Sequence, residues 1–347
     1  MPKNKYNLYK LNHILYLLII YLFISKYPQY STKNTIKISV FLPIYNKENY
    51  LAKVIENLQN QTLKDIEIVA LNDCSNDSSL EILNNLSKKD QRIKIINNDK
   101  NHGLLYSRAM GILNCSGEYL MNLDPDDEIK GEDSLEYLYK QSKYLDLDII
   151  SFNALDKKSN SIIKCIGKNI MYKQPDLFYS LFNRNNVIRE FAIWNKLIKK
   201  EIYLSAYEDF KDEIYNGKWN YFEDDIWNIL VNRHAKSRLC INKVIYIYNY
   251  NKDSLMNQKS RTIEFKNLIY RHEMYEKLFS LKKDEKYLLA EYYFLIKRFI
   301  SLQRYLLLLN NKDINNQIIN IIQFFLKKYE CSADEKNYIN DFLNLIK

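Results

Sequence analysis

The sequence predicts an α/β fold with a mainly parallel central sheet, covered by helices on both faces, and an α-helical C-terminal region. Short apolar runs alternate with segments whose apolar residues recur at helical spacing, an order typical of parallel βαβ units. The 347 residues include only six glycines and five prolines. All-β sandwiches need frequent turns built from these residues, so that class is disfavoured.

Each strand expected in the first half of the chain is a short apolar run that precedes or follows a helical stripe. The expected strands are 38–43, 66–71, 93–96 and 118–123, and the expected helices are 50–60, 80–86 and 104–113. In the second half the pattern predicts a strand at 148–152, helices at 194–203 and 224–234, and one or two strands within 238–250. Residues from about 262 onward contain neither Gly nor Pro and predict a helical bundle.

The first residues predict a membrane-associated protein. Residues 11–25 are uncharged and follow Lys3, Lys5 and Lys10, and no small-x-small cleavage site comes after them. We expect a single uncleaved anchor, in the endoplasmic reticulum or Golgi of a eukaryote or the inner membrane of a bacterium. A spanning helix needs roughly 20 residues. A cleaved signal, or the first helix of a cytoplasmic protein, therefore stays open.

Charge and cysteine content exclude some classes of function. The net charge of +9 is spread along the chain, and no basic stripe or recognition module appears, so nucleic acid is not an expected partner. The five cysteines are widely spaced and contain no C-x-x-C pair, which indicates neither a zinc site nor a disulfide framework.

Polar loops follow three of the expected parallel strands. They are Pro43-Ile-Tyr-Asn46, Asn72-Asp-Cys-Ser-Asn-Asp77 and Asp124-Pro-Asp-Asp127. Ligands of open α/β sheets bind at the carboxyl ends of the strands, so these loops are expected to converge on one site. Clustered carboxylates suit Mn²⁺ or Mg²⁺ completed by substrate phosphates. An Asp-Pro turn with a helix cap is the structural alternative.

Five segments along about 90 residues resemble family 2 glycosyltransferases. They are 38–47, Tyr50-Leu51 with 59–62, 65–77, 101–111 and 117–127, of which the last contains the D-x-D motif. The resemblance implies a GT-A fold, a Rossmann-like domain for nucleotide-diphosphate sugars, over residues 36–258. It leaves 1–35 as the hydrophobic segment with its linker and 259–347 as the helical region.

On the donor side, the resemblance gives roles to residues of the segments 38–47, 65–77 and 101–111. Pro43 and Tyr45 would lie at the nucleotide, with the Tyr45 ring against the base. Asp73 would accept a hydrogen bond from the imide N–H of uracil, which favours a UDP-linked donor. Arg108 would be a basic residue near the nucleotide. A surface tyrosine, a loop cap and a surface charge are the respective alternatives.

The D-x-D loop supplies the remaining donor-side roles. By resemblance, Asp124 would face the ribose or the sugar, and Asp126 would hold Mn²⁺ or Mg²⁺. Asp127 is expected to support the loop or cap a helix.

The later part of the chain contains the expected catalytic base. The segment 221–228 resembles the E-D motif at a helix start, which makes Asp224 the base. Glu223 and Asp225 are its neighbours in an ambiguous register, and acidic N-capping is the alternative. Trp194 belongs to another family-like segment and is expected either to line the acceptor side or to pack in the core.

The resemblance implies an inverting enzyme that transfers a sugar to a hydroxyl of a glycan, lipid or protein acceptor. No Q-x-x-R-W motif is present, which favours non-processive transfer. A sugar nucleotidyltransferase is one alternative, although its Gly-rich phosphate loop is missing after the first strand. A membrane-tethered, non-catalytic sugar- or nucleotide-binding protein is the other.

Overall fold

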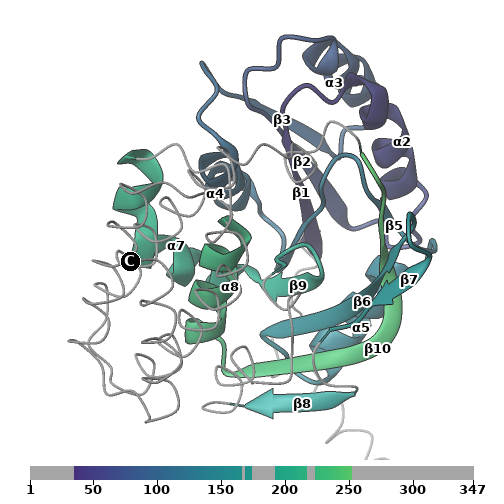
Figure 1. Ribbon diagram of the computed structural model, residues 1–347, viewed down its shortest axis with the longest axis vertical. Helices are drawn as coiled ribbons and strands as arrows, with labels where there is room; N and C mark the ends of the chain where they lie inside the picture. Colours follow the sequence, from purple (N-terminus) through teal and green to yellow (C-terminus); the bar gives the residue numbers. More distant parts are fainter. Residues whose placement is uncertain (1–34, 166–168, 174–191, 217–222, 252–347) are drawn as a thin grey trace, which may run out of the picture. The chain divides into compact units, whose positions relative to one another are not determined.

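The computed structural model describes residues 35–165, 169–173, 192–216 and 223–251 (Figure 1). The chain divides into two units, Met1–Ile36 and Lys37–Lys347, and every helix and strand described below belongs to the second. The predicted anchor at 11–25 and the predicted helical region 259–347 lie outside the described residues.

A single mixed sheet organises the domain, with strand order β3-β2-β1-β4-β9-β6-β10-β5. Its first four strands are parallel, which confirms the predicted α/β class; they are β3 (Ile93–Asn97), β2 (Ile66–Asn72), β1 (Ile38–Ile44) and β4 (Tyr119–Asn122). β9 (Lys196–Lys199) runs antiparallel between β4 and β6 (Ile149–Asp156), and β6 is parallel to β10 (Ser237–Tyr248). Short antiparallel partners complete the sheet, namely β5 (Glu128–Ile129), β7 (Ser161–Ile163) and β8 (Ile170–Lys173).

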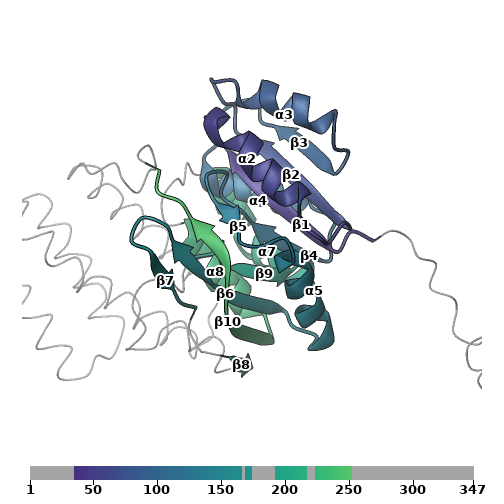
Figure 2. The ribbon, with the colours of Figure 1, turned by 90° about the vertical axis from the view of Figure 1, so that its right-hand side faces the viewer.

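Helices cover both faces of this sheet, as predicted (Figure 2). One face carries α2 (Glu48–Gln59), α3 (Ser79–Ser87) and α5 (Ser134–Tyr144); the other carries α4 (Leu104–Asn114), α7 (Lys200–Asn216) and α8 (Glu223–His234). In β1, Phe41 packs in the core of the α4 face, whereas Val40 and Leu42 pack in the core of the α2 face. Because both faces are buried, each central strand is a continuous apolar run.

A buried polar cluster joins three strands at their amino ends. Ser39 Oγ donates a 2.5 Å hydrogen bond to Glu67 Oε1, and Ser116 Oγ donates to Glu67 Oε2 at 2.7 Å. Gly117 N donates to Ser39 Oγ at 2.7 Å, and a Cβ at Gly117 would lie 2.5 Å from Ser39 N. The chain therefore needs glycine here, because β4 enters the sheet against the backbone of β1.

The helix predicted at 194–203 is wrong in its first half. Residues Lys196–Lys199 form β9, and α7 begins only at Lys200. Leu197 is buried on the α2 face of the sheet and Ile198 on the α4 face. Consecutive apolar residues buried on opposite faces cannot be told from a short helical stripe by periodicity.

The expected membrane localisation is corrected by the structure. Within the described ranges, no helix is both long and apolar enough to span a membrane. The longest of these helices, α7, has 17 residues and carries several charged side chains, whereas a spanning helix needs roughly 20 mostly apolar residues.

Candidate active site

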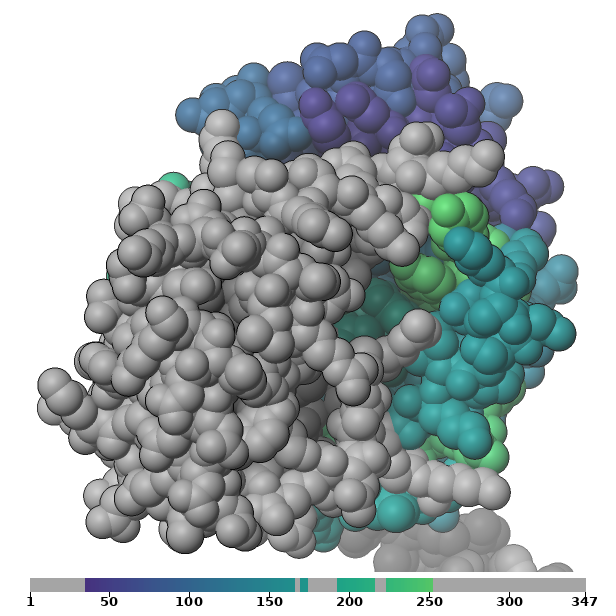
Figure 3. All heavy atoms as spheres, viewed as in Figure 1, coloured from purple at the N-terminus to yellow at the C-terminus, as the bar shows by residue number. Residues whose placement is uncertain are grey.

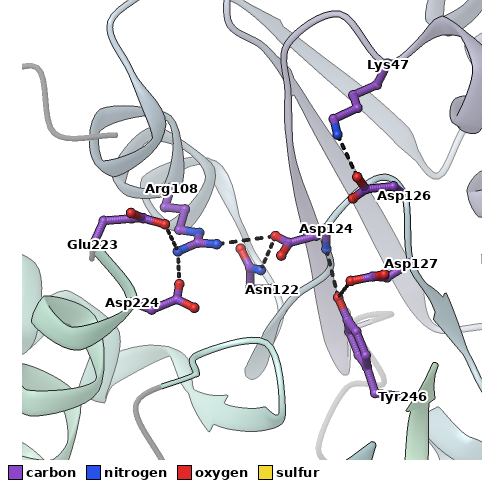
Figure 4. Close-up of polar contacts among 9 residues, drawn as sticks. All are labelled: Lys47, Arg108, Asn122, Asp124, Asp126, Asp127, Glu223, Asp224 and Tyr246. Carbon is purple, nitrogen blue, oxygen red and sulfur yellow. Dashed lines mark hydrogen bonds and ion pairs between the residues drawn. The ribbon is translucent and has the colours of Figure 1, made fainter. Parts of the chain in front are cut away.

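The loop after β4 is held by the end of β10. Asp127 is buried, and its carboxylate accepts hydrogen bonds from Tyr246 Oη at 2.8 Å and from Asn249 N at 2.8 Å. Asp124 N donates to the same Tyr246 hydroxyl at 3.3 Å (Figure 4). Burial, reinforced by Asp124 and Asp126, raises the pKa of Asp127 well above its usual range. These contacts give Asp127 a supporting position inside the loop.

Asp126 lies on the other side of this loop and points toward the loop after β1. Its Oδ2 accepts a 2.7 Å ion pair from Lys47 Nζ and a 2.7 Å hydrogen bond from Asn251 Nδ2. Asn249 Nδ2 donates to the Asp126 carbonyl at 2.9 Å. In the space-filling view, the bright green atoms at the end of β10 lie between purple atoms, which belong to the first described residues, and teal atoms from the middle of the chain (Figure 3).

The carboxylate oxygens of Asp126 suit a divalent cation whose other ligands come from substrate phosphates and water. Oδ1 of Asp126 has no hydrogen-bond partner within the described ranges, and the side chain is 15% exposed. Those same residues contain no group of three or more His, Cys, Asp or Glu side chains arranged for a metal. Mg²⁺ and similar cations commonly use one or two carboxylates and complete their shell with phosphate and water oxygens. A cation at Asp126 would therefore have few protein ligands.

Arg108 brings three carboxylates together at the carboxyl edge of the sheet. It is buried on α4, and its Nη1 donates to Glu223 Oε1 at 2.8 Å and also pairs with Asp224 Oδ1. Its Nη2 contacts Asp124 Oδ1 at 3.3 Å, and Asn122 Nδ2 donates to the same oxygen at 3.0 Å (Figure 4). The first turn of α8 therefore meets the D-x-D loop through one guanidinium.

Burial dominates the ionisation of this cluster. It raises the pKa of Glu223 to about 8 and that of Asp224 to about 6, each against the opposing effect of Arg108. Burial also lowers the pKa of Arg108, but the three carboxylates outweigh it and the pKa lies above its ordinary value. Burial therefore favours the protonated form of both carboxyls, more strongly for Glu223 than for Asp224.

The three acids at the start of α8 differ in exposure. The Asp224 side chain is 25% exposed and that of Glu223 8%. Asp225 is buried. A general base must reach its substrate, and Asp224 has the least buried side chain of the three, so it is the candidate best placed for that role.

Asp73 caps α4 from the loop after β2. Its carboxylate accepts hydrogen bonds from Asn98 Nδ2 at 2.7 Å, His102 N at 3.0 Å and Gly103 N at 2.9 Å. The cap expected as the alternative is thus present, and the carboxylate keeps acceptor capacity for one further donor. Cys74, which follows, has φ 57°, in the left-handed region that favours glycine.

Pro43 and Tyr45 lie beyond the point where β1 stops pairing with β4. The β1–β4 pairing ends at Phe41, whose carbonyl accepts from Leu123 N at 3.1 Å. Pro43 is two residues later and faces the same way, so its missing N–H costs no ladder bond. The Tyr45 side chain is 42% exposed, and its hydroxyl accepts from Asn76 Nδ2 at 3.5 Å.

Trp194 is a buried side chain behind the D-x-D loop. It is 7% exposed and stacks on Tyr246 with ring centroids 4.7 Å apart and on Tyr248 at 5.9 Å. Its contacts are those of the core alternative: it supports the tyrosine whose hydroxyl holds Asp127.

Several residues at this edge were missed by sequence reasoning. They are Lys47, Tyr246, Asn249 and Asn251. The same rule that led to the other loops would have found the asparagines, because they directly follow β10 at its carboxyl end. Lys47 is the last residue of the first family-like segment.

The strand order, the two helical layers and the acidic carboxyl edge define a GT-A domain, as predicted. Residues 39–205 match the family model for glycosyl transferase family 2, the family that the motifs had predicted.

Known glycosyltransferases resemble the chain over parts of their length. Glycosyltransferase GlyA of Streptococcus pneumoniae serotype 4 is 32% identical over 230 residues, which are 63% of this chain and 31% of that protein. A cholesterol galactosyltransferase of Borreliella burgdorferi is 34% identical over 179 residues, 48% of this chain and 49% of that protein. The chain thus spans less than half of either relative.

A solved structure shares the fold. The crystal structure of S. aureus TarS 1–349 has a TM-score of 0.61 and 17% identity, and the match covers 84% of this chain and 80% of that one. The same protein in complex with UDP-GlcNAc gives a TM-score of 0.51 at 16% identity, covering 81% and 83%.

Proposed function

We propose that this chain is an inverting, non-processive glycosyltransferase that moves a sugar from a UDP-linked donor to an acceptor hydroxyl. One observation carries the proposal. In a family 2 domain, the base candidate Asp224 and the D-x-D residue Asp124 meet on Arg108 at the carboxyl edge of the sheet. Sugar transfer requires the base and the donor-binding loop to be neighbours, because the acceptor hydroxyl must lie next to the bound donor.

The donor site is formed by the loops after β1, β2 and β4. The exposed Tyr45 ring offers a face on which a base can stack. The Asp73 carboxylate accepts three hydrogen bonds and keeps acceptor capacity for one more, which the imide N–H of uracil would donate, and Asp124 would face the ribose or the sugar. The UDP-GlcNAc bound by S. aureus TarS, which has the same fold, supports a UDP-linked donor.

Asp224 is the proposed general base. As the acceptor oxygen forms its bond to the anomeric carbon, the bond from that carbon to the diphosphate oxygen breaks, and the acceptor proton moves to Asp224. A single displacement of this kind inverts the anomeric centre. A pKa of about 6 keeps Asp224 ionised at neutral pH while leaving it basic enough to take the proton.

Asp126 would hold Mn²⁺ or Mg²⁺ through its carboxylate. A bound cation would place positive charge against the diphosphate leaving group. The acceptor is a hydroxyl of a glycan, lipid or protein. Lys47, which pairs with Asp126, contributes a second positive charge beside the same carboxylate.

A donor screen tests the proposal. The chain is incubated with common sugar nucleotides, with and without Mn²⁺, and nucleoside diphosphate release is measured for the native protein and for Asp126→Ala. We expect release with a UDP-linked sugar, and loss of at least tenfold in the variant. Asp65→Ala is the matched control, because Asp65 pairs with Lys37 at the opposite end of the strands.

Two results would contradict the proposal. Pyrophosphate release from a nucleoside triphosphate and a sugar phosphate would favour the nucleotidyltransferase alternative. Donor binding by calorimetry without turnover across glycan, lipid and peptide acceptors would favour the non-catalytic binding protein.

A further inference from the structure

The sequence placed Arg108 near the nucleotide, but its contacts in the structure point elsewhere. The residue is 2% exposed, and both terminal nitrogens are already engaged. Nη1 serves Glu223 and Asp224 on α8, and only Nη2 reaches Asp124, at 3.3 Å. A guanidinium that is buried and occupied in this way is poorly placed to bind a diphosphate directly.

Arg108 also sits on the helix that organises the donor side. α4 begins at Leu104, and Asp73 Oδ2 accepts from Gly103 N at 2.9 Å at its start. One turn later, Arg108 reaches α8 and the loop after β4. The same helix therefore connects the loop proposed for the nucleotide base with the proposed catalytic base.

We propose that Arg108 is a positioning residue, which holds the carboxylate of Asp224 in line with the D-x-D loop instead of binding the donor. The inference rests on the proposed function, because it assigns a role within that reaction. The geometry is the reason: one rigid, planar group with fixed donor directions contacts carboxylates from two segments that are 100 residues apart in sequence.

The electrostatic consequence has a definite sign. The charged and titratable groups around Asp224 lie on α4, α7, α8 and the loop after β4; they are Arg108, Tyr203, Glu223, Asp225 and Asp124. Among them Arg108 is the cation and favours the ionised carboxylate, whereas Asp124 and Asp225 oppose it. Without Arg108, Asp224 would hold its proton to a higher pH, so the acid limb of kcat would move upward.

The experiment compares Arg108→Lys and Arg108→Met with Arg92→Lys and Arg92→Met in the full chain. Arg92 is the matched control, because it is a half-buried arginine paired with Asp90 at 2.7 Å before β3, away from the site. Three quantities are measured: the Kd for UDP by calorimetry, kcat and KM with the donor found in the screen, and the pH dependence of kcat. A thermal melt verifies that each variant is folded.

We expect Arg108→Met to keep its Kd for UDP within about threefold while kcat falls at least tenfold. Its acid limb should move up by about one pH unit or more, with Arg108→Lys between it and the native protein. Both Arg92 variants should match the native protein in all three quantities. If Arg108→Met does not fold, Arg108→Lys decides by its kcat and its Kd for UDP, because lysine keeps the positive charge but lacks the planar guanidinium that contacts both carboxylates.

The opposite pattern overturns the inference. A rise of tenfold or more in the Kd for UDP, with kcat and the acid limb unchanged, would make Arg108 a donor-binding residue. Unchanged kcat and pH profile in a folded Arg108→Met would remove it from the reaction. These failures differ from failure of the proposed function, in which the native protein itself shows no transfer.

Discussion

Replacing Asp224 by Asn removes a charge and the ability to take a proton while the shape of the side chain stays the same. In the native protein, the pKa of about 6 lies below pH 7.5, so the ionised form of Asp224, which can take a proton, predominates at this pH. An amide in its place cannot accept the proton of the acceptor hydroxyl.

The expected loss follows from the role of a general base. Such groups contribute about 10²- to 10⁴-fold to kcat, which corresponds to about 2.7–5.4 kcal/mol of transition-state stabilisation. Stability should not fall in parallel. Burial raises the pKa of Asp224 in the folded state, so its ionised form opposes folding above that pKa, and a neutral amide relieves this cost.

The assay is nucleoside diphosphate release with donor and acceptor saturating, followed from pH 5 to 9, together with urea unfolding. We expect kcat to fall at least 100-fold at pH 7.5 and the acid limb near pH 6 to disappear. Asp225→Asn removes the neighbouring carboxylate and should cost less than tenfold. An Asp224→Asn protein that keeps more than a tenth of native kcat, or a larger loss in Asp225→Asn, would refute the assignment.

Three further predictions concern stability, each measured by urea unfolding. Gly117→Ala should lose about 2–4 kcal/mol, because the new Cβ would lie 2.5 Å from Ser39 N; a loss under 0.5 kcal/mol would contradict the packing. Glu67→Gln should lose about 1–3 kcal/mol at pH 7. Burial by itself would raise the pKa of Glu67, but the hydrogen bonds from Ser39, Ser116 and Gly117 lower it below 4.5. The difference in unfolding free energy between the native protein and Glu67→Gln should therefore shrink as the pH falls below 4.5, and a difference that grows would contradict the prediction. Cys74→Gly should gain about 0.5–1 kcal/mol, because φ 57° is strained for a side chain; an unchanged midpoint would argue against the strain.

Much of the first half of this fold could be predicted because its signals are local. The strands beginning at Ile38, Ile66 and Ile93 are apolar runs next to helical stripes, and their pattern does not depend on distant residues. The strand Lys196–Lys199 was mistaken for helix because its burial on both faces is decided by the sheet into which it inserts. Tertiary contacts therefore overrode the local pattern.

The order of strands and loops along the chain was enough to predict that the acids after β2 and β4 lie at the carboxyl edge, because parallel βαβ units place the ends of such strands on the same side. The contacts of those acids, in contrast, depend on how distant segments pack together. Arg108 and Asp224 are 116 residues apart, and Lys47 and Asp126 are 79 apart. The first pair depends on where α8 returns to the sheet, and the second depends on the pairing of β1 with β4. The ionisation of the site depends on burial, which has no local sequence signal, so the partner of Arg108 and the raised pKa of Asp224 became visible only in the folded chain.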